Sequence, residues 1–168
     1  MLGNDYEDQE CSVARALEVV GERWSLLIVR DVLLGMRRFD ELQAHLGIAR
    51  NVLQARLQRL IAADVLERRP YSAHPLRHEY RLTEKGLDLW PTIVALMQWG
   101  DRYARPRTGV PVVLEHRGCG GAVDEHRVCS RCGARLSVRD VRGLPGPGAS
   151  GEHPLHARVQ REDAAAAA

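Results

Sequence analysis

Apolar residues recur at helical spacing through the first third of the chain. One face carries Val13, Ala14, Leu17 and Val20, and after Gly21 the pattern resumes with Trp24, Leu27, Ile28 and Val32 until Gly35. A period of three to four residues that breaks at glycine predicts two helices within residues 11–34.

Two further helices are predicted around residues 39–46 and 50–62, with Gly47-Ile48 between them. In the longer one, Leu53, Leu57, Leu60 and Ile61 form a single apolar stripe. The opposite face of that helix is therefore free for another role. Two compact helices joined by a short turn have the dimensions of a helix-turn-helix.

Residues 64–83 change in character, because two short extended segments there flank Pro70, His74 and Pro75. Prolines at these positions exclude a continuous helix and favour a β-hairpin with a basic tip. Thr83 follows the hairpin and can cap the N-terminus of a final helix that reaches about residue 103.

The final helix, over residues 84–103, is apolar on almost every side. Its apolar residues are Leu87, Leu89, Trp90, Ile93, Val94, Leu96, Met97 and Trp99. Because the core of a small domain covers only one side of a helix, we expect a homodimer formed through this helix and the N-terminal helices. Pro91 is expected to kink the helix or to divide it in two.

Composition and charge are those of a globular protein in the cytoplasm. The 168 residues are 45% apolar and 27% charged, which allows one domain with an appendage. No apolar run approaches the roughly 18 residues of a membrane helix, and residues 1–10 form an acidic extension without a signal-peptide pattern. We therefore expect no membrane partner.

The charge pattern and the free helix face point to double-stranded DNA as the partner. Residues 48–85 hold eight basic and four acidic side chains. In the N-terminal half of the predicted recognition helix, about 50–62, Arg50 can address guanine, and Asn51 and Gln54 can address adenine. Further along, Arg56 and Arg59 are placed to meet phosphates or to cover the helix flank. A merely solvated polar face is the alternative.

The hairpin forms a predicted wing, about residues 66–82, for the DNA backbone or minor groove. Its candidate contacts are His74, Arg77 and His78, because basic side chains at a wing tip can reach phosphates or the minor groove. Arg68 and Arg69 lie in or beside a strand and could equally be surface charge.

Six short motifs occur in order along residues 11–86. They are Cys11-x-Val-x-x-Ala-Leu, Glu22-Arg23-Trp24 with Leu27-Ile28, Arg38-Phe39-x-Glu41-Leu42, Leu53-x-x-Arg56-Leu57-x-x-Leu60, Arg69-x-Tyr71-x-x-x-Pro75 and Glu79-Tyr80-x-Leu82-Thr83-x-x-Gly86. Over about residues 11–103 the chain resembles the HxlR-type family of bacterial winged helix-turn-helix regulators. The resemblance implies a dimer that binds operator DNA and controls a neighbouring gene, often as a repressor.

One position departs from the family pattern. Ala49 stands where many members carry a serine that caps the recognition helix. Either the cap is lost, at about 1 kcal/mol, or Asn51 caps a helix that starts later and is then not a base reader.

A second cluster lies behind the winged domain, with the spacing His116-x2-Cys119-x9-Cys129-x2-Cys132. Two such ligand pairs, each followed by glycine, predict one structural zinc ion in a ribbon-like site. Residues 112–114 and 136–138 are expected to supply flanking strands, and His126 is a rival fourth ligand. A redox pair of Cys129 and Cys132, or free thiols, are the alternatives.

The expected fold class is mainly α with a small β-wing. It comprises an acidic extension (1–10), a winged helix-turn-helix domain with its dimerisation helix (11–104), a small β zinc-ribbon-like module (110–142) and a disordered tail (143–168) with too little apolar content to pack. The expected function is that of a homodimeric repressor, and a small-molecule or redox effector is a candidate partner.

Two other functions stay open. The family resemblance implies that Cys11 can sense oxidants, although a helix-start cysteine without that role is the alternative. The zinc ribbon could instead bind another protein, with the winged domain serving only to dimerise. No paired nucleophile and base, phosphate loop or open metal site is present in the sequence, so we do not expect an enzyme.

Overall fold

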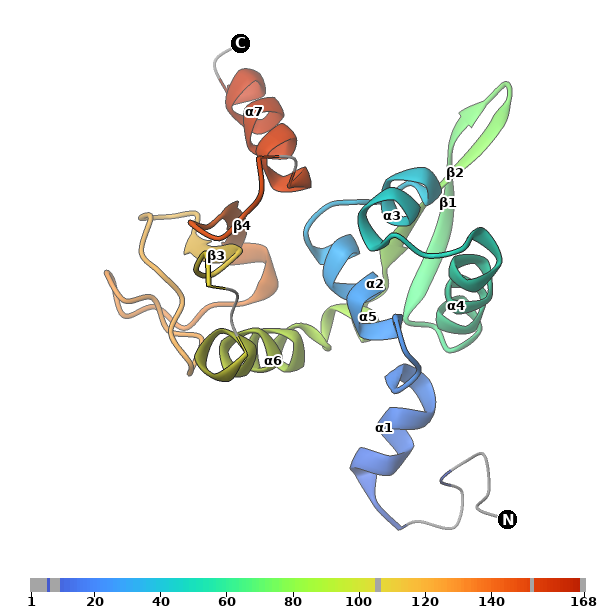
Figure 1. Cartoon of the computed structure of the whole chain (residues 1–168), viewed down its shortest axis with the longest axis horizontal. Coiled ribbons are helices and arrows are strands. Elements are labelled where there is room, and N and C mark those ends of the chain that lie inside the picture. Colours follow the sequence, from blue (N-terminus) through green and yellow to red (C-terminus); the bar gives the residue numbers. More distant parts are fainter. Residues whose placement is uncertain (1–5, 7–9, 105–106, 152, 167–168) are drawn as a thin grey trace. The chain divides into compact units, whose positions relative to one another are not determined.

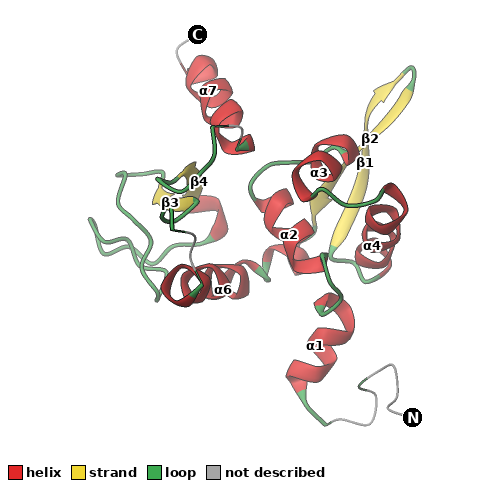
Figure 2. Cartoon of the chain, in the orientation of Figure 1, coloured by secondary structure: helices red, strands yellow, loops and turns green. Residues whose placement is uncertain are grey.

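The computed structural model describes residues 6, 10–104, 107–151 and 153–166 (Figure 1). Its contacts divide the chain into two compact units, residues 1–89 and 90–168. Each unit contains helices and one antiparallel sheet of two strands, β1–β2 in the first and β3–β4 in the second (Figure 2). All of the predicted acidic extension except Tyr6 and Glu10 lies outside the described residues.

The first unit opens with the four predicted helices, α1 (Ser12–Val20), α2 (Ser25–Leu33), α3 (Phe39–Leu46) and α4 (Arg50–Ala62). Their apolar faces meet in a core in which Ile28, Leu42, Leu53, Leu57 and Leu60 are at most 1% exposed. The turn between α3 and α4 needs Gly47, whose φ of +63° lies in the left-handed region. Its N–H donates to the carbonyl of Gln43 at 3.0 Å and so closes α3.

A fully buried carboxylate joins α2 to α3. Asp31 accepts hydrogen bonds from Nε and Nη2 of Arg30 at 2.8 and 2.7 Å. Its other oxygen lies 2.8 Å from Nδ1 of His45 on α3. Because Asp31 has no exposed surface, its charge depends on these two partners in place of water.

The predicted hairpin is present as β1 (Leu66–Ala73) and β2 (Leu76–Leu82), paired antiparallel with a register shift between Pro70 and Ser72. The segment before α3 adds to its edge, because the N–H of Tyr80 donates to the carbonyl of Arg37 at 2.7 Å. The Arg38 guanidinium also lies 4.8 Å from the centre of the Tyr71 ring. These contacts fix the base of the wing to the helix-turn-helix.

The predicted final helix divides in two, as Pro91 allowed. Thr83 caps α5 (Glu84–Leu87), accepting a hydrogen bond from the N–H of Gly86 at 3.1 Å. The second helix, α6 (Trp90–Tyr103), has Pro91 in its first turn, where proline costs no hydrogen bond. Contacts group α6 with the C-terminal unit, whereas the sequence analysis assigned it to the winged domain.

The second unit corrects the prediction of strands around the cysteines. Strand β3 (Val112–His116) is present, but its partner is β4 (Val141–Pro145). Residues Val138–Asp140 form a 3-10 turn instead of a strand. The cause is local, because the carboxylate of Asp140 accepts from the N–H and hydroxyl of Ser137 and thereby caps the turn.

The prediction of a disordered tail from residue 143 is wrong for the residues that the structure describes. Strand β4 extends to Pro145, and α7 (Pro154–Ala166) packs on it through Leu155, which is 1% exposed. The glycines between them permit close backbone approach: a Cβ at Gly146 would lie 2.3 Å from the carbonyl oxygen of Val110. Residues 152, 167 and 168 lie outside the description.

No helix within the described part of the chain is long and apolar enough to cross a membrane.

Candidate functional site

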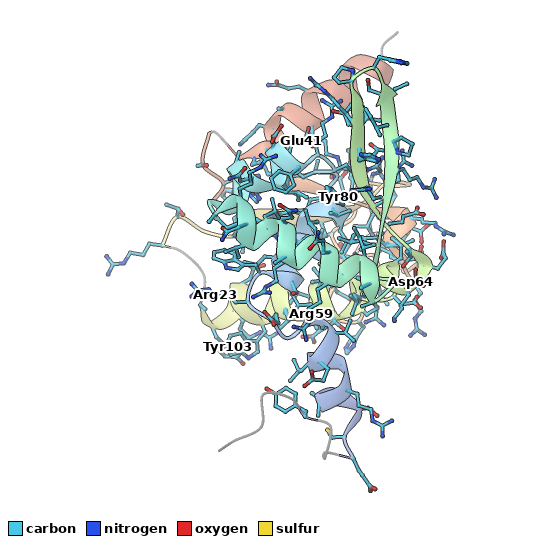
Figure 3. All side chains as sticks on the ribbon, turned by 90° about the vertical axis from the view of Figure 1, so that its right-hand side faces the viewer. Arg23, Glu41, Arg59, Asp64, Tyr80 and Tyr103 are labelled. Carbon is cyan, nitrogen blue, oxygen red and sulfur yellow. The ribbon has the colours of Figure 1, made fainter. Side chains whose placement is uncertain are left out.

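Helix α4 has one buried face and one exposed polar face. Leu53, Leu57 and Leu60 are buried, whereas Asn51, Gln54, Ala55 and Gln58 are exposed. The four exposed residues recur at i, i+3, i+4 and i+7, which places them side by side on one helix face. Figure 3 shows α4 crossing the side of the molecule that faces the viewer, with the hairpin beside it.

The start of α4 decides between the two roles considered for Asn51. The residue before the helix is Ala49, which has extended backbone and no side-chain cap. Asn51 therefore lies inside the first turn and does not cap the helix, so its amide is available for other contacts. The structure thus shows the first of the two alternatives, in which the recognition helix has no side-chain cap at Ala49.

Arg50 lies at the edge of this face and contacts α3. Its guanidinium lies 4.5 Å from the centre of the Phe39 ring and 3.8 Å from a carboxylate oxygen of Asp40. The side chain nevertheless remains 69% exposed. A cation held over an aromatic ring is oriented without being removed from solvent, so Arg50 can still reach an external ligand.

Arg56 and Arg59 bind the chain itself. Both guanidinium groups pair with the carboxylate of Glu22, at 2.5 Å for Arg59. Arg56 also donates to the carbonyl of Arg23 at 3.2 Å, and Arg59 donates to that of Glu18 at 3.1 Å. In Figure 3, Arg59 lies on the α1 side of α4. These contacts favour covering the helix flank, the second of the two roles considered for this pair.

The wing tip presents the predicted basic residues unequally. His74 and Arg77 are exposed, and His78 is half-buried opposite Pro70. Leu76, which the sequence analysis did not single out, is an apolar residue that is 65% exposed at the tip. Of the two ambiguous arginines, Arg69 pairs with Glu67 at 2.6 Å.

The structure brings together the four predicted metal ligands. The ligand atoms of His116, Cys119, Cys129 and Cys132 all lie within 4.8 Å of one another. His116 ends β3, and its Nδ1 lies 3.3 Å from Sγ of Cys119 and 3.4 Å from Sγ of Cys132. Sγ of Cys119 and Sγ of Cys129 are 3.3 Å apart. Tetrahedral zinc holds such atoms roughly 3.6 to 3.8 Å apart, so the cluster can bind a metal with little adjustment.

The backbone around Cys129 favours its thiolate form. The N–H groups of Cys132 and Arg131 point at Sγ, and that of Arg131 lies at 3.4 Å. These donors lower the pKa of Cys129 to about 6. Gly121 lets the chain pass this sulfur, because a Cβ there would lie 2.4 Å from it.

Two other residues singled out in the sequence lie outside the cluster. His126, the rival ligand, is 80% exposed and lies near Glu125 instead. Cys11 is exposed at the residue that precedes α1. The structure therefore favours His116 as the fourth ligand and leaves Cys11 as a separate thiol.

A helix-turn-helix followed by a two-stranded wing is the architecture of a winged helix-turn-helix protein, and comparison with known proteins gives the family. The profile of the HxlR-like helix-turn-helix family matches residues 19–108, more than half of the chain. The chain therefore belongs to the HxlR-like family of DNA-binding transcriptional regulators. The resemblance noted in the sequence is confirmed.

Individual relatives agree with this assignment. An uncharacterized HTH-type transcriptional regulator of Mycobacterium tuberculosis strain H37Rv, Rv3095, is 50% identical over 137 residues, which cover 82% of this chain and 87% of that protein. The crystal structure of PA1607, described as a candidate transcription factor, is 41% identical with a TM-score of 0.64 and covers 79% of this chain and 93% of its own. The oxidized form of the redox regulator HypR is 29% identical with a TM-score of 0.54, covering 57% of this chain and all of its own.

Proposed function

We propose that the protein is a homodimeric repressor that inserts α4 into the major groove of operator DNA. The observation that carries this proposal is the exposed polar face of α4, which lies opposite a fully buried leucine stripe. The second helix of a helix-turn-helix docks in this way, with its N-terminal residues on base edges. Arg50, Asn51 and Gln54 occupy that end of α4.

The wing complements the helix. Arg77 and His74 are exposed at its tip, at positions suited to phosphates or the minor groove. Because the base of the hairpin is hydrogen-bonded to the segment before α3, the wing and the recognition helix would approach DNA as one rigid surface. His78, half-buried within the hairpin, is the least accessible of the three wing residues.

Binding to operator DNA should fail when the base-reading end of α4 is truncated. In a gel-shift assay with DNA from upstream of its own gene, Arg50→Ala and Gln54→Ala are each expected to weaken binding by about 1–3 kcal/mol, because each removes a base contact. Gln160→Ala, an exposed glutamine on α7, is the matched control and should bind like the unmodified protein. Unchanged affinity in both α4 variants would show that α4 does not read bases.

Dimerisation is supported by apolar side chains that remain exposed in the single chain. On α6 these are Leu96, Trp99 and Tyr103, at 49%, 61% and 67% exposure, and on α1 they are Val13 and Leu17. Large apolar residues grouped on a helix face indicate an association surface. We propose a second copy of the chain as the occupant, because helix-turn-helix proteins bind paired half-sites as dimers.

Sedimentation equilibrium should therefore give twice the chain mass of 18.8 kDa. Leu96→Asp places a charge in the proposed interface and should shift the protein to the single-chain mass, because the charge would lose its water there. Gln160→Asp adds the same charge to α7 and should leave the dimer intact. A single-chain mass for the unmodified protein at micromolar concentration would reject the dimer.

A redox-responsive form of the same function is favoured by one comparison. The chain resembles the redox regulator HypR, and Cys11 is an exposed thiol beside the first turn of α1. The gel-shift assay decides this alternative: DNA binding that changes with a peroxide in the unmodified protein, but not in Cys11→Ser, would establish Cys11 as the sensor. An equal response in both would exclude it.

We further propose that the His116, Cys119, Cys129 and Cys132 cluster holds one structural zinc ion. The support is the convergence of four ligand atoms from two tight turns, with two backbone N–H groups directed at a buried sulfur. Three thiolates and one imidazole form a donor set typical of zinc, and four protein ligands leave no position for catalysis. The ion would fasten the turn after β3 to the turn that carries Cys129.

A further inference from the structure

We infer that α4 recognises A·T base pairs, and that Gln58 and Ala55 read the operator together with Asn51 and Gln54. This inference rests on the proposed function, because it specifies the DNA that the recognition helix selects. It adds two residues that the sequence analysis did not single out. Gln58 lies seven positions after Asn51, two turns further along the same exposed face.

The first argument is the availability of the amides. Asn51, Gln54 and Gln58 are exposed, and within the described ranges no hydrogen bond is found from any of their side chains. By contrast, Gln43 on α3 donates to the carbonyl of Ile48 at 3.4 Å. The amides on the outer face of α4 therefore keep their donors and acceptors for an external partner.

The second argument is the position of the arginines. Guanine is most often read by arginine, which donates two hydrogen bonds to O6 and N7. Arg56 and Arg59 direct these donors to Glu22 and to backbone carbonyls of the same unit. Arg50 is the most exposed of the three arginines on α4, with 69% of its side chain exposed against 45% for Arg59 and 25% for Arg56, and it lies at the very start of the helix, oriented by Phe39. The middle of the reading face thus lacks a free guanine reader.

The remaining side chains on the exposed face of α4 match the chemistry of adenine and thymine. An asparagine or glutamine amide pairs with adenine by donating to N7 and accepting from N6, and a small apolar side chain contacts the thymine methyl group. Ala55 lies between Gln54 and Gln58 on the same face and supplies such a methyl. The distance along the helix from Asn51 to Gln58 is about 10 Å, roughly three base-pair steps of 3.4 Å.

Selection of binding sites from a pool of random duplexes tests the inference with the full-length protein. The expected product has two half-sites, each with a run of about three A·T pairs. On the selected site, Gln58→Ala should weaken binding about fivefold to a hundredfold, the loss of one bidentate base contact. Alanine favours helix at this position, so the variant should fold, and Gln160→Ala should bind unchanged.

A second variant separates base reading from general affinity. Gln58→Arg replaces the amide by a guanine reader and should shift the selected base under that position from A·T to G·C. Half-sites dominated by G·C pairs, or a Gln58→Ala variant that selects and binds like the unmodified protein, would overturn the inference while the proposed function stands. Failure to select any sequence would instead overturn the proposed function.

Discussion

Replacing Cys129 by serine should release zinc from the protein and unfold the segment between β3 and β4. Cys129 is 2% exposed, and its sulfur lies 3.3 Å from that of Cys119 within the cluster of four ligands. A serine hydroxyl is a poor substitute for a thiolate as a zinc ligand. The apparent free energy that a structural zinc ion contributes to the folding of a small module is roughly 10–16 kcal/mol. Metal analysis should fall from about one zinc ion per chain to well below one.

The cysteine outside the cluster provides the control. Cys11→Ser removes an exposed thiol and should leave both the zinc content and the protease resistance of residues 107–151 unchanged. Cys129→Ser should make that segment sensitive to protease, while the helices of the first unit keep their circular dichroism signal. Purified unmodified protein with well below one zinc ion per chain, or a Cys129→Ser variant that retains its metal, would contradict the structural zinc site.

Replacing Asp31 by alanine should destabilise the winged unit more than any exposed substitution. The change leaves His45 and the Arg30 guanidinium without the carboxylate that both contact. Removing one member of a buried ion pair costs about 3–5 kcal/mol, and the lower end applies here because the side chains of Arg30 and His45 are 28% and 18% exposed. Urea denaturation followed by far-ultraviolet circular dichroism measures the loss.

Asp88→Ala is the matched control for Asp31→Ala. Asp88 is exposed, so its removal should change the free energy of unfolding by no more than about 0.5 kcal/mol. If Asp31→Ala were as stable as this control, the link between α2 and α3 would depend on apolar packing alone.

The winged half of the molecule was predictable because its signals are local. The leucine stripe of α4, the glycine at position 47 and the cap at Thr83 each specify structure within a few residues of themselves. The same periodicity that identified Gln54 also points to Gln58, which the sequence analysis passed over in favour of the N-terminal half of the helix. The four metal ligands were likewise predictable, because each pair of ligands lies within a single turn of the chain.

Distant residues decide the features that the sequence left open or predicted wrongly. The partner of Arg56 and Arg59 is Glu22, more than thirty positions earlier, and no local pattern predicts that contact. The tail looked disordered because it is rich in glycine and proline. In the structure, its glycines let the backbone pass close to residues 109 and 110, and Leu155 supplies the apolar anchor.

The carboxylate of Glu22 has a consequence for how the protein would respond to salt. A DNA-binding protein loses affinity with rising salt in proportion to the number of phosphates whose condensed counterions it displaces. Glu22 carries a single negative charge and so neutralises only one of the two positive charges of Arg56 and Arg59. The pair would therefore displace fewer such ions from DNA than two free arginines would, and the salt dependence would be shallower than the number of arginines on α4 suggests.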